Sequence, residues 1–321
     1  MRAMHLSVLG IGIAMTVAWM GMASADHACT APASAAATDT PGPPSVTPVA
    51  APASAPNSAP PDSAAPRARG DTGLTGAVGE EEFKELHDLP GGKVPPARGI
   101  MVDLAGTHAY LSLPEHGAPP FPAVVVVHEW WGLNEHIKYW SDRLAAEGYA
   151  ALAVDLFGGK VATNRDSAMA YVRAVDDERA LAILRAAHEF LASDPRIAAT
   201  RRGCIGWCFG GGWALQQALV TPDLDAAVIY YGRLVTDVER LRAIQSPVLG
   251  VFGNRDRGIP PEMVDEFAAA LVKAGVEHHI LRYDAEHAFA NPSNPNYDRQ
   301  AAAAAWMEVR AFLAGNLQTV R

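Results

Sequence analysis

Basic residues are scarce in this sequence of 321 residues, and their scarcity excludes a class of function. The 26 lysines and arginines are outnumbered by 35 aspartates and glutamates, which gives a formal net charge of −9 at pH 7. Binding to nucleic acids requires a basic patch that neutralises phosphates. We therefore expect no nucleic-acid partner, and nothing in the sequence identifies a protein partner.

Metal ligands and phosphate-binding loops are missing in any usable arrangement. His128 and Glu129 do not begin a His-Glu-x-x-His zinc motif, because residue 132 is glycine. His278 and His279 are adjacent in an expected strand, so their side chains point to opposite faces and cannot chelate one ion. No glycine-rich phosphate loop of either common type occurs. We predict neither a metal nor a cofactor.

Cysteine is also rare. The three cysteines are Cys29, Cys204 and Cys208, and they form no Cys-x-x-Cys pair, which argues against a thiol redox protein. Cys204 and Cys208 are four residues apart along an expected strand. At about 3.3 Å per residue their Cα atoms lie beyond disulfide reach. We expect Cys29 to stay unpaired.

The N-terminal apolar run is too short for an ordinary membrane span, which takes about 20 residues. Arg2 precedes the run from Leu6 to Met22, which ends in a small-residue Ala-x-Ala site at Ala25. This pattern is typical of a secretory signal peptide. We predict a signal peptide at 1–25, no stable membrane span after cleavage, and a periplasmic or secreted location in a bacterium.

The next segment has the composition of a tether. Residues 26–75 are rich in alanine, proline and serine, and such a segment cannot bury enough apolar surface to offset its ordering entropy. We expect it to be disordered. Residues 76–97, which include an acidic stretch at 80–86, would then form an adaptor leading into a domain at 98–321.

Residues 206–211 carry the most informative motif. They are Gly-Trp-Cys-Phe-Gly-Gly, between a β-prone stretch at 202–205 and a stretch with helical spacing at 213–219. Strand, sharp turn and helix are the context of a nucleophile elbow, with Cys208 as the nucleophile. The residues two places before and after it must lack a Cβ, because the turn is tight. A buried, inert cysteine in a glycine-rich turn is the alternative.

Two groups that can activate a thiol follow Cys208 along the chain. Asp256 comes after an apolar run at 247–252, and His287 comes after a strand-like run at 279–283. Nucleophile, acid and histidine occur in this order in α/β-hydrolases. His287 would take the thiol proton, while Asp256 would fix its tautomer and stabilise the imidazolium. Taken singly, Asp256 could be a turn former and His287 a satisfied loop residue, but type, order and location together favour catalysis.

The remaining pattern alternates strands and helices, which favours a mostly parallel central sheet with helices on both faces. Asn134 is a candidate N-cap for a helix that ends at Gly148, and residues 150–154 form the next expected strand. Further helices are expected at 179–191, at 261–273 before Gly275, and at 299–316.

Five blocks of the sequence resemble the dienelactone hydrolase family. They are the elbow and residues 128–134 (His-Glu-Trp-Trp-Gly-Leu-Asn), 144–149 (Leu-Ala-Ala-Glu-Gly-Tyr), 154–159 (Val-Asp-Leu-Phe-Gly-Gly) and 286–289 (Glu-His-Ala-Phe). The resemblance extends over about two-thirds of the chain, from 98 to 317. It implies the α/β-hydrolase fold and activity on small-molecule esters or lactones. It also implies a triad of Cys208, His287 and Asp256, with an oxyanion hole made by the backbone N–H groups of Trp130 and Phe209.

The resemblance gives Glu129 a gating role. In the family, the glutamate at this position holds the resting thiol, and substrate binding displaces it so that a thiolate–imidazolium pair forms. Such a gate is physically sensible because a permanent thiolate invites oxidation and because a nearby carboxylate opposes its formation. A solvated glutamate at the mouth of the buried strand 123–127 is the alternative, and the adjacent His128 is more simply structural.

Substrate choice is where the sequence departs from the family. Members that cleave dienelactone have an arginine shortly after the catalytic histidine that pairs with the substrate carboxylate, and here Asn291 occupies that place. An amide cannot reproduce bidentate carboxylate recognition, so dienelactone itself is a doubtful substrate. Arg165 corresponds weakly to a second family arginine. Aromatic side chains could line an apolar pocket or belong to the core, namely Trp130, Trp131, Trp207, Tyr230 and Tyr231.

These observations favour a hydrolase of esters or lactones that works through an acyl-enzyme intermediate. The main rival is a non-catalytic ligand-binding or sensor module that kept the hydrolase fold. A complete triad argues against that rival, whereas the fold alone would not.

Overall fold

The computed structural model describes residues 97–318. The predicted signal peptide at 1–25 with its cleavage site at Ala25, the tether at 26–75 with Cys29, and the adaptor up to residue 96 lie outside these residues. The described residues include the expected domain from residue 98 up to residue 318.

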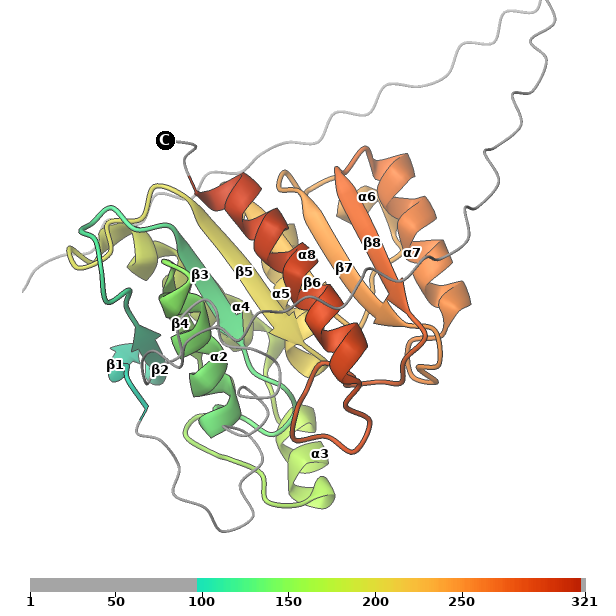
Figure 1. The fold of residues 1–321 in the computed structure, drawn as a ribbon, viewed down its shortest axis with the longest axis horizontal. Coiled ribbons are helices and arrows are strands. Elements are labelled where there is room, and N and C mark those ends of the chain that lie inside the picture. Colours follow the sequence, from blue (N-terminus) through green and yellow to red (C-terminus); the bar gives the residue numbers. More distant parts are fainter. Residues whose placement is uncertain (1–96, 319–321) are drawn as a thin grey trace, which may run out of the picture. The chain divides into compact units, whose positions relative to one another are not determined.

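A central sheet of eight strands organises the described residues (Figure 1). Its spatial order is β1-β2-β4-β3-β5-β6-β7-β8. Strands β3 to β8 run parallel, whereas β2 is antiparallel to both β1 and β4. The prediction of a mostly parallel sheet is confirmed. The strands are β1 (Ile100–Leu104), β2 (Thr107–Ser112), β3 (Ala123–Val127), β4 (Ala150–Val154), β5 (Arg202–Trp207), β6 (Ala226–Tyr230), β7 (Val248–Gly253) and β8 (His278–Tyr283).

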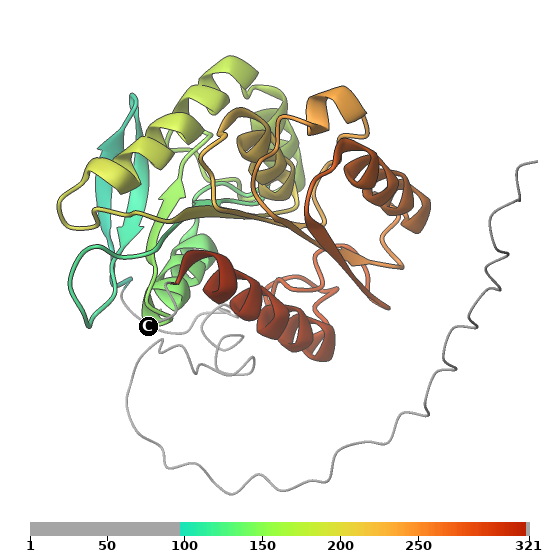
Figure 2. The same ribbon diagram turned by 90° about the horizontal axis from the view of Figure 1, so that it is seen from above.

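Helices cover both faces of the sheet, as Figure 2 shows from above. One face packs against α2 (Glu135–Ala146) and α8 (Arg299–Leu317). The other face packs against α4 (Asp177–Ser193), α5 (Phe209–Val220), α6 (Val238–Leu241) and α7 (Pro261–Ala274). Every residue of β3 and β4 is buried, which explains their continuous apolar sequences. A short helix, α3 (Arg165–Arg173), lies beyond the carboxyl ends of the strands (Figure 1).

Local signals fix the ends of these helices. The Asn134 side chain accepts a hydrogen bond from the N–H of Ile137 at 3.3 Å and so begins α2, as predicted. Gly275 ends α7 in the left-handed conformation with φ of 76°, which glycine adopts without steric cost. Asn164 and Ser167 form a capping box at the start of α3.

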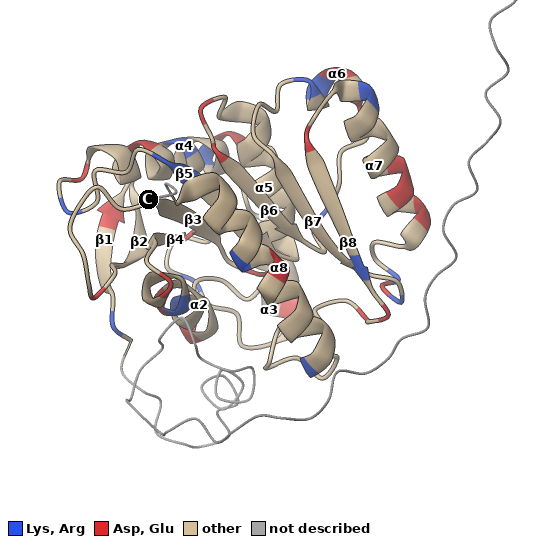
Figure 3. Cartoon of the chain, turned by 45° about the horizontal axis from the view of Figure 1, so that its top comes forward, with Lys and Arg blue, Asp and Glu red and all other residues tan. Residues whose placement is uncertain are grey.

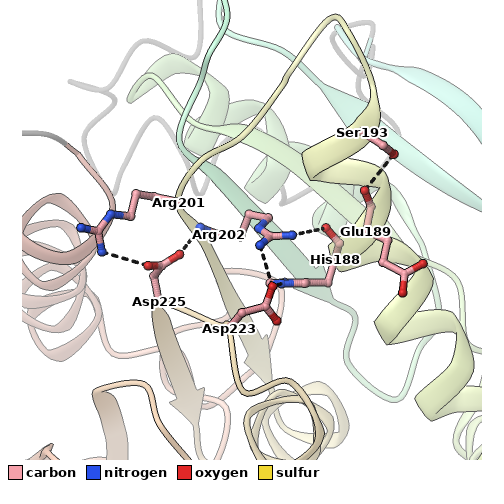
Figure 4. Close-up of polar contacts among 7 residues, drawn as sticks. All are labelled: His188, Glu189, Ser193, Arg201, Arg202, Asp223 and Asp225. Carbon is pink, nitrogen blue, oxygen red and sulfur yellow. Dashed lines mark hydrogen bonds and ion pairs between the residues drawn. The ribbon is translucent and has the colours of Figure 1, made fainter.

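A polar cluster ties α4 to the amino ends of β5 and β6 (Figure 4). The guanidinium of Arg202 donates to Asp223 at 2.7 Å and to the carbonyl of His188 at 3.3 Å. The Arg202 backbone N–H donates to Asp225 at 2.8 Å. Burial lowers the pKa of His188, which favours its neutral ring. The cluster lies at the edge of the sheet opposite the carboxyl ends of the strands.

Charged residues of both signs are distributed along the chain, and acidic residues, red in Figure 3, gather along α7. These are Glu262, Asp265 and Glu266. Among the helices of residues 97–318, none has the length and apolar character that crossing a membrane requires.

Candidate active site

Cys208 sits in a sharp turn between β5 and α5. Its φ of 54° and ψ of −116° are unusual for a residue with a side chain, and its N–H donates to the carbonyl of Tyr230 at 3.0 Å. Strained backbone of this kind occurs at functional sites that the surrounding structure holds in place. The strand–turn–helix context predicted for residues 206–211 is therefore present.

The glycines on either side of Cys208 are required by close backbone contacts. A Cβ on Gly206 would lie 2.1 Å from the carbonyl oxygen of Gly210, and a Cβ on Gly210 would lie 2.2 Å from the carbonyl oxygen of Val127. Neither backbone oxygen can move aside as a flexible side chain could. The predicted need for residues without a Cβ two places from Cys208 is confirmed.

Three side chains from distant parts of the chain form a hydrogen-bonded row. The Nε2 atom of His287 lies 3.2 Å from the Sγ atom of Cys208. Its Nδ1 atom lies 2.6 Å from the Oδ2 atom of Asp256. Asp256 and His287 stand in the loops after β7 and β8, at the carboxyl edge where parallel sheets carry their functional loops. The structure thus brings together the three residues predicted to form a triad.

Asp256 is held so that one oxygen faces the imidazole. Its Oδ1 atom accepts the N–H groups of Gly258 at 2.8 Å and Ile259 at 3.1 Å, which leaves Oδ2 for His287. Burial alone would raise the pKa of Asp256, but the hydrogen bond and charge of His287, with these two N–H groups, lower it below its ordinary value. The carboxylate is therefore ionised at neutral pH.

His287 is set up to carry a positive charge. Burial favours the neutral ring, but hydrogen bonds with Asp256 and Cys208 and the charges of both outweigh burial and raise the pKa of His287 to about 10. An imidazolium next to a sulfur atom stabilises the thiolate. The arrangement can thus hold a thiolate–imidazolium pair.

Glu129 is buried near this pair, with 7 % of its surface exposed, so the alternative of a solvated glutamate is wrong. Its Oε2 atom accepts a hydrogen bond from Nδ2 of Asn291 at 2.5 Å, while Oε1 has no partner among the described residues. Burial raises the pKa of Glu129 to about 7, although the charge of His287 and the hydrogen bond from Asn291 lower it in part. In this structure the thiol contacts His287, whereas the family gate would have Glu129 hold it.

His128 is structural, as its position suggested. The ring is fully buried and its Nε2 atom accepts the N–H of Leu156 at 3.1 Å. Its Nδ1 atom lies 2.6 Å from the carbonyl oxygen of Glu129 and must therefore carry the ring proton. His128 thus orients the loop after β3.

Two backbone N–H groups near the elbow are candidates for stabilising negative charge. Phe209 is the first residue of α5, so its N–H has no acceptor within the helix. Among the backbone hydrogen bonds that the described residues make outside helices and strands, none has the N–H of Trp130 as donor. The Phe209 N–H directly follows Cys208 at the start of α5, and the Trp130 N–H belongs to the loop after β3.

The five aromatic residues considered for an apolar pocket differ in their burial. Trp207, Tyr230 and Tyr231 are at most 1 % exposed and belong to the core, whereas Trp130 and Trp131 are half-buried. The Tyr231 ring packs against the His287 ring, with 5.1 Å between their centroids. The sequence alone did not indicate a contact between Tyr231 and the histidine.

Two of the predicted substrate residues lie in contrasting surroundings. Asn291 is buried and bound to Glu129, so its amide does not face solvent. Arg165 begins α3 with its side chain exposed, and within residues 97–318 no hydrogen bond or ion pair joins it to Cys208, His287 or Glu129. The structure offers no support for Arg165 as a substrate ligand.

The remaining cysteine of the described region is inert. Cys204 is fully buried and unpaired, and burial raises its pKa far above the ordinary value. Neither Cys204 nor Cys208 forms a disulfide, in agreement with the spacing argument. In the part of the chain that the structure describes, no group of three or more His, Cys, Asp or Glu side chains could hold a metal ion.

Comparison with known proteins gives a consistent result. The model of the dienelactone hydrolase family matches residues 107–317. A protein of Methylorubrum extorquens named "Putative carboxymethylenebutenolidase" is 33 % identical over 233 residues, which cover 68 % of this chain and 78 % of that protein. A protein of the same name from Saccharolobus solfataricus is 30 % identical over 251 residues, 66 % of this chain and 95 % of that one.

A solved structure has the same fold. It is a dienelactone hydrolase-like promiscuous phosphotriesterase from metagenomic libraries, with a TM-score of 0.62 and 27 % sequence identity. The match covers 69 % of this chain and 98 % of that chain. The expected α/β-hydrolase fold is confirmed.

Proposed function

The chain belongs to the dienelactone hydrolase family, and we propose that it hydrolyses ester or lactone bonds through Cys208, His287 and Asp256. The observation that carries the proposal is the unbroken row from the Cys208 sulfur through the imidazole of His287 to the Asp256 carboxylate. Each member has the residue type and the contact that its role requires.

The first half of the reaction transfers the acyl group to sulfur. The thiol proton resides on His287, and the thiolate attacks the carbonyl carbon to form a tetrahedral adduct. His287 then gives that proton to the leaving oxygen as its bond to carbon breaks. An alcohol departs from an ester, whereas the hydroxyl released from a lactone stays attached to the acyl chain.

The second half returns the enzyme to its starting state. His287 takes a proton from a water molecule, whose oxygen attacks the thioester carbon. The carbon–sulfur bond breaks, the thiolate leaves and the product acid is released. Asp256 stabilises the imidazolium in both halves without taking its proton.

The backbone N–H groups of Trp130 and Phe209 would bind the developing oxyanion. Phe209 directly follows Cys208, and the N-terminus of α5 adds the positive end of its dipole at the same place. Glu129 would act on the same thiol. Its negative charge opposes formation of the thiolate, whereas its protonated form does not.

The substrate is proposed to be a small ester or lactone without a carboxylate beside the reacting carbonyl. Asn291 is neutral and already bound to Glu129, so it offers no cation to such a carboxylate. Trp131 is half-buried against Trp130 in the loop after β3, and its ring is proposed to contact an apolar acyl or alkyl group.

We further propose that the protein is exported and that the domain acts in the periplasm or outside the cell. The apolar run at 6–22 and the small-residue site at Ala25 support this. Sequencing the N-terminus of the mature protein from a periplasmic fraction tests it. A chain that keeps Arg2 and remains in the cytoplasm would refute it.

The hydrolase proposal is tested by assaying the purified protein with p-nitrophenyl acetate and a panel of lactones with and without a carboxylate. We expect turnover of neutral substrates, and loss of turnover in Cys208→Ala. Cys208→Ser should retain little activity, because a hydroxyl needs stronger base assistance than a thiol. Turnover by Cys208→Ala at the parent rate would refute the proposed nucleophile. Ligand binding without turnover by the parent would favour a binding module.

A further inference from the structure

The geometry points to Asn291 as a positioning residue that holds Glu129 away from the thiol, so that the Cys208–His287 pair is already formed before substrate binds. This inference rests on the proposed function, because it concerns how the same nucleophile is kept ready. The Cys208–His287 pair would thus be present in the substrate-free protein. In the gate that the family resemblance implies, this pair forms only after substrate binds.

Glu129 and His287 are in a position to compete for the Cys208 thiol. β3 and β5 are parallel neighbours, with Val127 opposite Gly206. Glu129 follows Val127 by two residues and Cys208 follows Gly206 by two, so both lie just past the carboxyl ends of neighbouring strands. The Tyr231 hydroxyl provides a second indication, because its pKa is raised first by burial and then by the charges of Glu129, Tyr230 and Cys208. Glu129 and Cys208 therefore lie close to the same buried atom.

The side chain of Asn291 can face Glu129 in one orientation only. Its Oδ1 atom accepts the N–H of Ser293 at 2.9 Å, so that oxygen is engaged within its own turn. The amide nitrogen, which is a donor, is thereby directed at Oε2 of Glu129. The Asn291 backbone adds rigidity, because its N–H donates to Ala288 and its carbonyl accepts from Asn294, each at 3.0 Å.

The contact leaves the thiol to His287. One oxygen of Glu129 is bound by Asn291, and the other has no partner among the described residues. A buried carboxylate that lost its donor would seek another, and the nearby thiol is a donor within the same pocket. Asn291 therefore decides whether the Cys208 proton goes to His287 or is held by Glu129.

The test measures alkylation of Cys208 by iodoacetamide in the substrate-free protein at pH 7. All variants carry Cys29→Ser, and buried Cys204 serves as an unreactive internal reference. Asn291→Leu removes the donor while keeping the site filled. We expect its alkylation rate to fall about tenfold, equivalent to one hydrogen bond of about 1.4 kcal/mol.

Two controls separate positioning from general damage. Asn294→Leu makes the same chemical change in the same turn without touching Glu129, and should alkylate at the parent rate. In a Glu129→Gln background, which lacks the competing carboxylate, Asn291→Leu should have little further effect. Thermal melting of each variant confirms that it is folded.

The inference is overturned if Asn291→Leu, when folded, alkylates at the parent rate, or if its loss is equally large in the Glu129→Gln background. Alkylation needs no turnover, so this outcome is distinct from failure of the proposed function. Full esterase activity in Cys208→Ala would remove the proposed function whatever the alkylation rates are.

Discussion

The Nε2 atom of His287 lies 3.2 Å from the Sγ atom of Cys208, although the two residues are 79 positions apart in the sequence. The parallel sheet makes this contact possible, because all strands from β3 to β8 end at the same edge. The loop after β8 returns over β6, where Tyr231 supports the imidazole. Sheet topology thus places proton donor and acceptor together.

Asp256→Asn should lower kcat/KM for p-nitrophenyl acetate by roughly 10²–10⁴-fold while leaving the melting temperature nearly unchanged. The N–H groups of Gly258 and Ile259 would keep the amide oxygen, so the amide nitrogen would face His287. Nδ1 would then have to accept, and the neutral ring would carry its proton on Nε2. Such a ring cannot take the thiol proton. Activity close to that of the parent would mean that Asp256 does not orient the base.

Gly206→Ala should destabilise the protein by several kcal/mol or prevent folding, because the added Cβ meets a backbone oxygen at 2.1 Å. Gly315→Ala in α8 is the matched control, since nothing lies within 4 Å of its Cβ position. It should raise stability by about 0.5–1 kcal/mol through helix propensity. Urea titration of both variants measures the difference. Equal stability of the two would contradict the packing of the elbow.

Glu129→Gln should stabilise the protein above pH 7 and remove a pH dependence of stability. The folded state raises the Glu129 pKa from 4.5 to about 7, so the folded protein binds more protons than the unfolded chain in this window. Stability from this group therefore falls as pH rises from about 4.5 to 7, by at most roughly 3 kcal/mol. Denaturant titrations of parent and variant at pH 4.5, 6 and 8 test this. If the stabilities of parent and variant depended on pH in the same way, burial would not raise the pKa of the Glu129 carboxyl.

Arg202→Met should cost about 1 kcal/mol of stability and leave the esterase rate unchanged. The substitution keeps the apolar stem but removes the contacts with Asp223 and His188 seen in Figure 4. Asp223 is largely exposed, which limits the loss. Arg242→Met breaks a pair in which both side chains are mostly exposed and should cost less. A fall in esterase rate in Arg202→Met would link this cluster to the site.

Much of the fold was readable in the sequence because local and global signals agree. The apolar run of β3, the Asn134 cap of α2 and the left-handed Gly275 after α7 each act within a few residues. The β1–β2 hairpin and α3 were not predicted. The hairpin turns at Ala105 and Gly106, both with positive φ, and alanine gives no warning of that conformation. The helix α3 begins at the capping box that Asn164 and Ser167 form.

The catalytic residues of the site could be predicted where a sequence motif and the order of residues along the chain indicate their role. Cys208, Asp256 and His287 could be named because each follows a strand. The contact between Asn291 and Glu129 could not, because it joins residues 162 positions apart and depends on the path of the loop after β8. Tyr231 was missed as a support for His287 for the same reason. Its type indicates a core residue, and its contact with the imidazole arises from tertiary packing.

The most direct test of Cys208 as the nucleophile is to trap the acyl-enzyme. Parent protein carrying Cys29→Ser is mixed with p-nitrophenyl acetate, quenched during the burst of p-nitrophenol and digested for mass spectrometry. If Cys208 is the nucleophile, one acetyl group will be found on the peptide that contains it, formed at the rate of the burst. Steady turnover with no acetyl group on Cys208, or with the label on another residue, would contradict it.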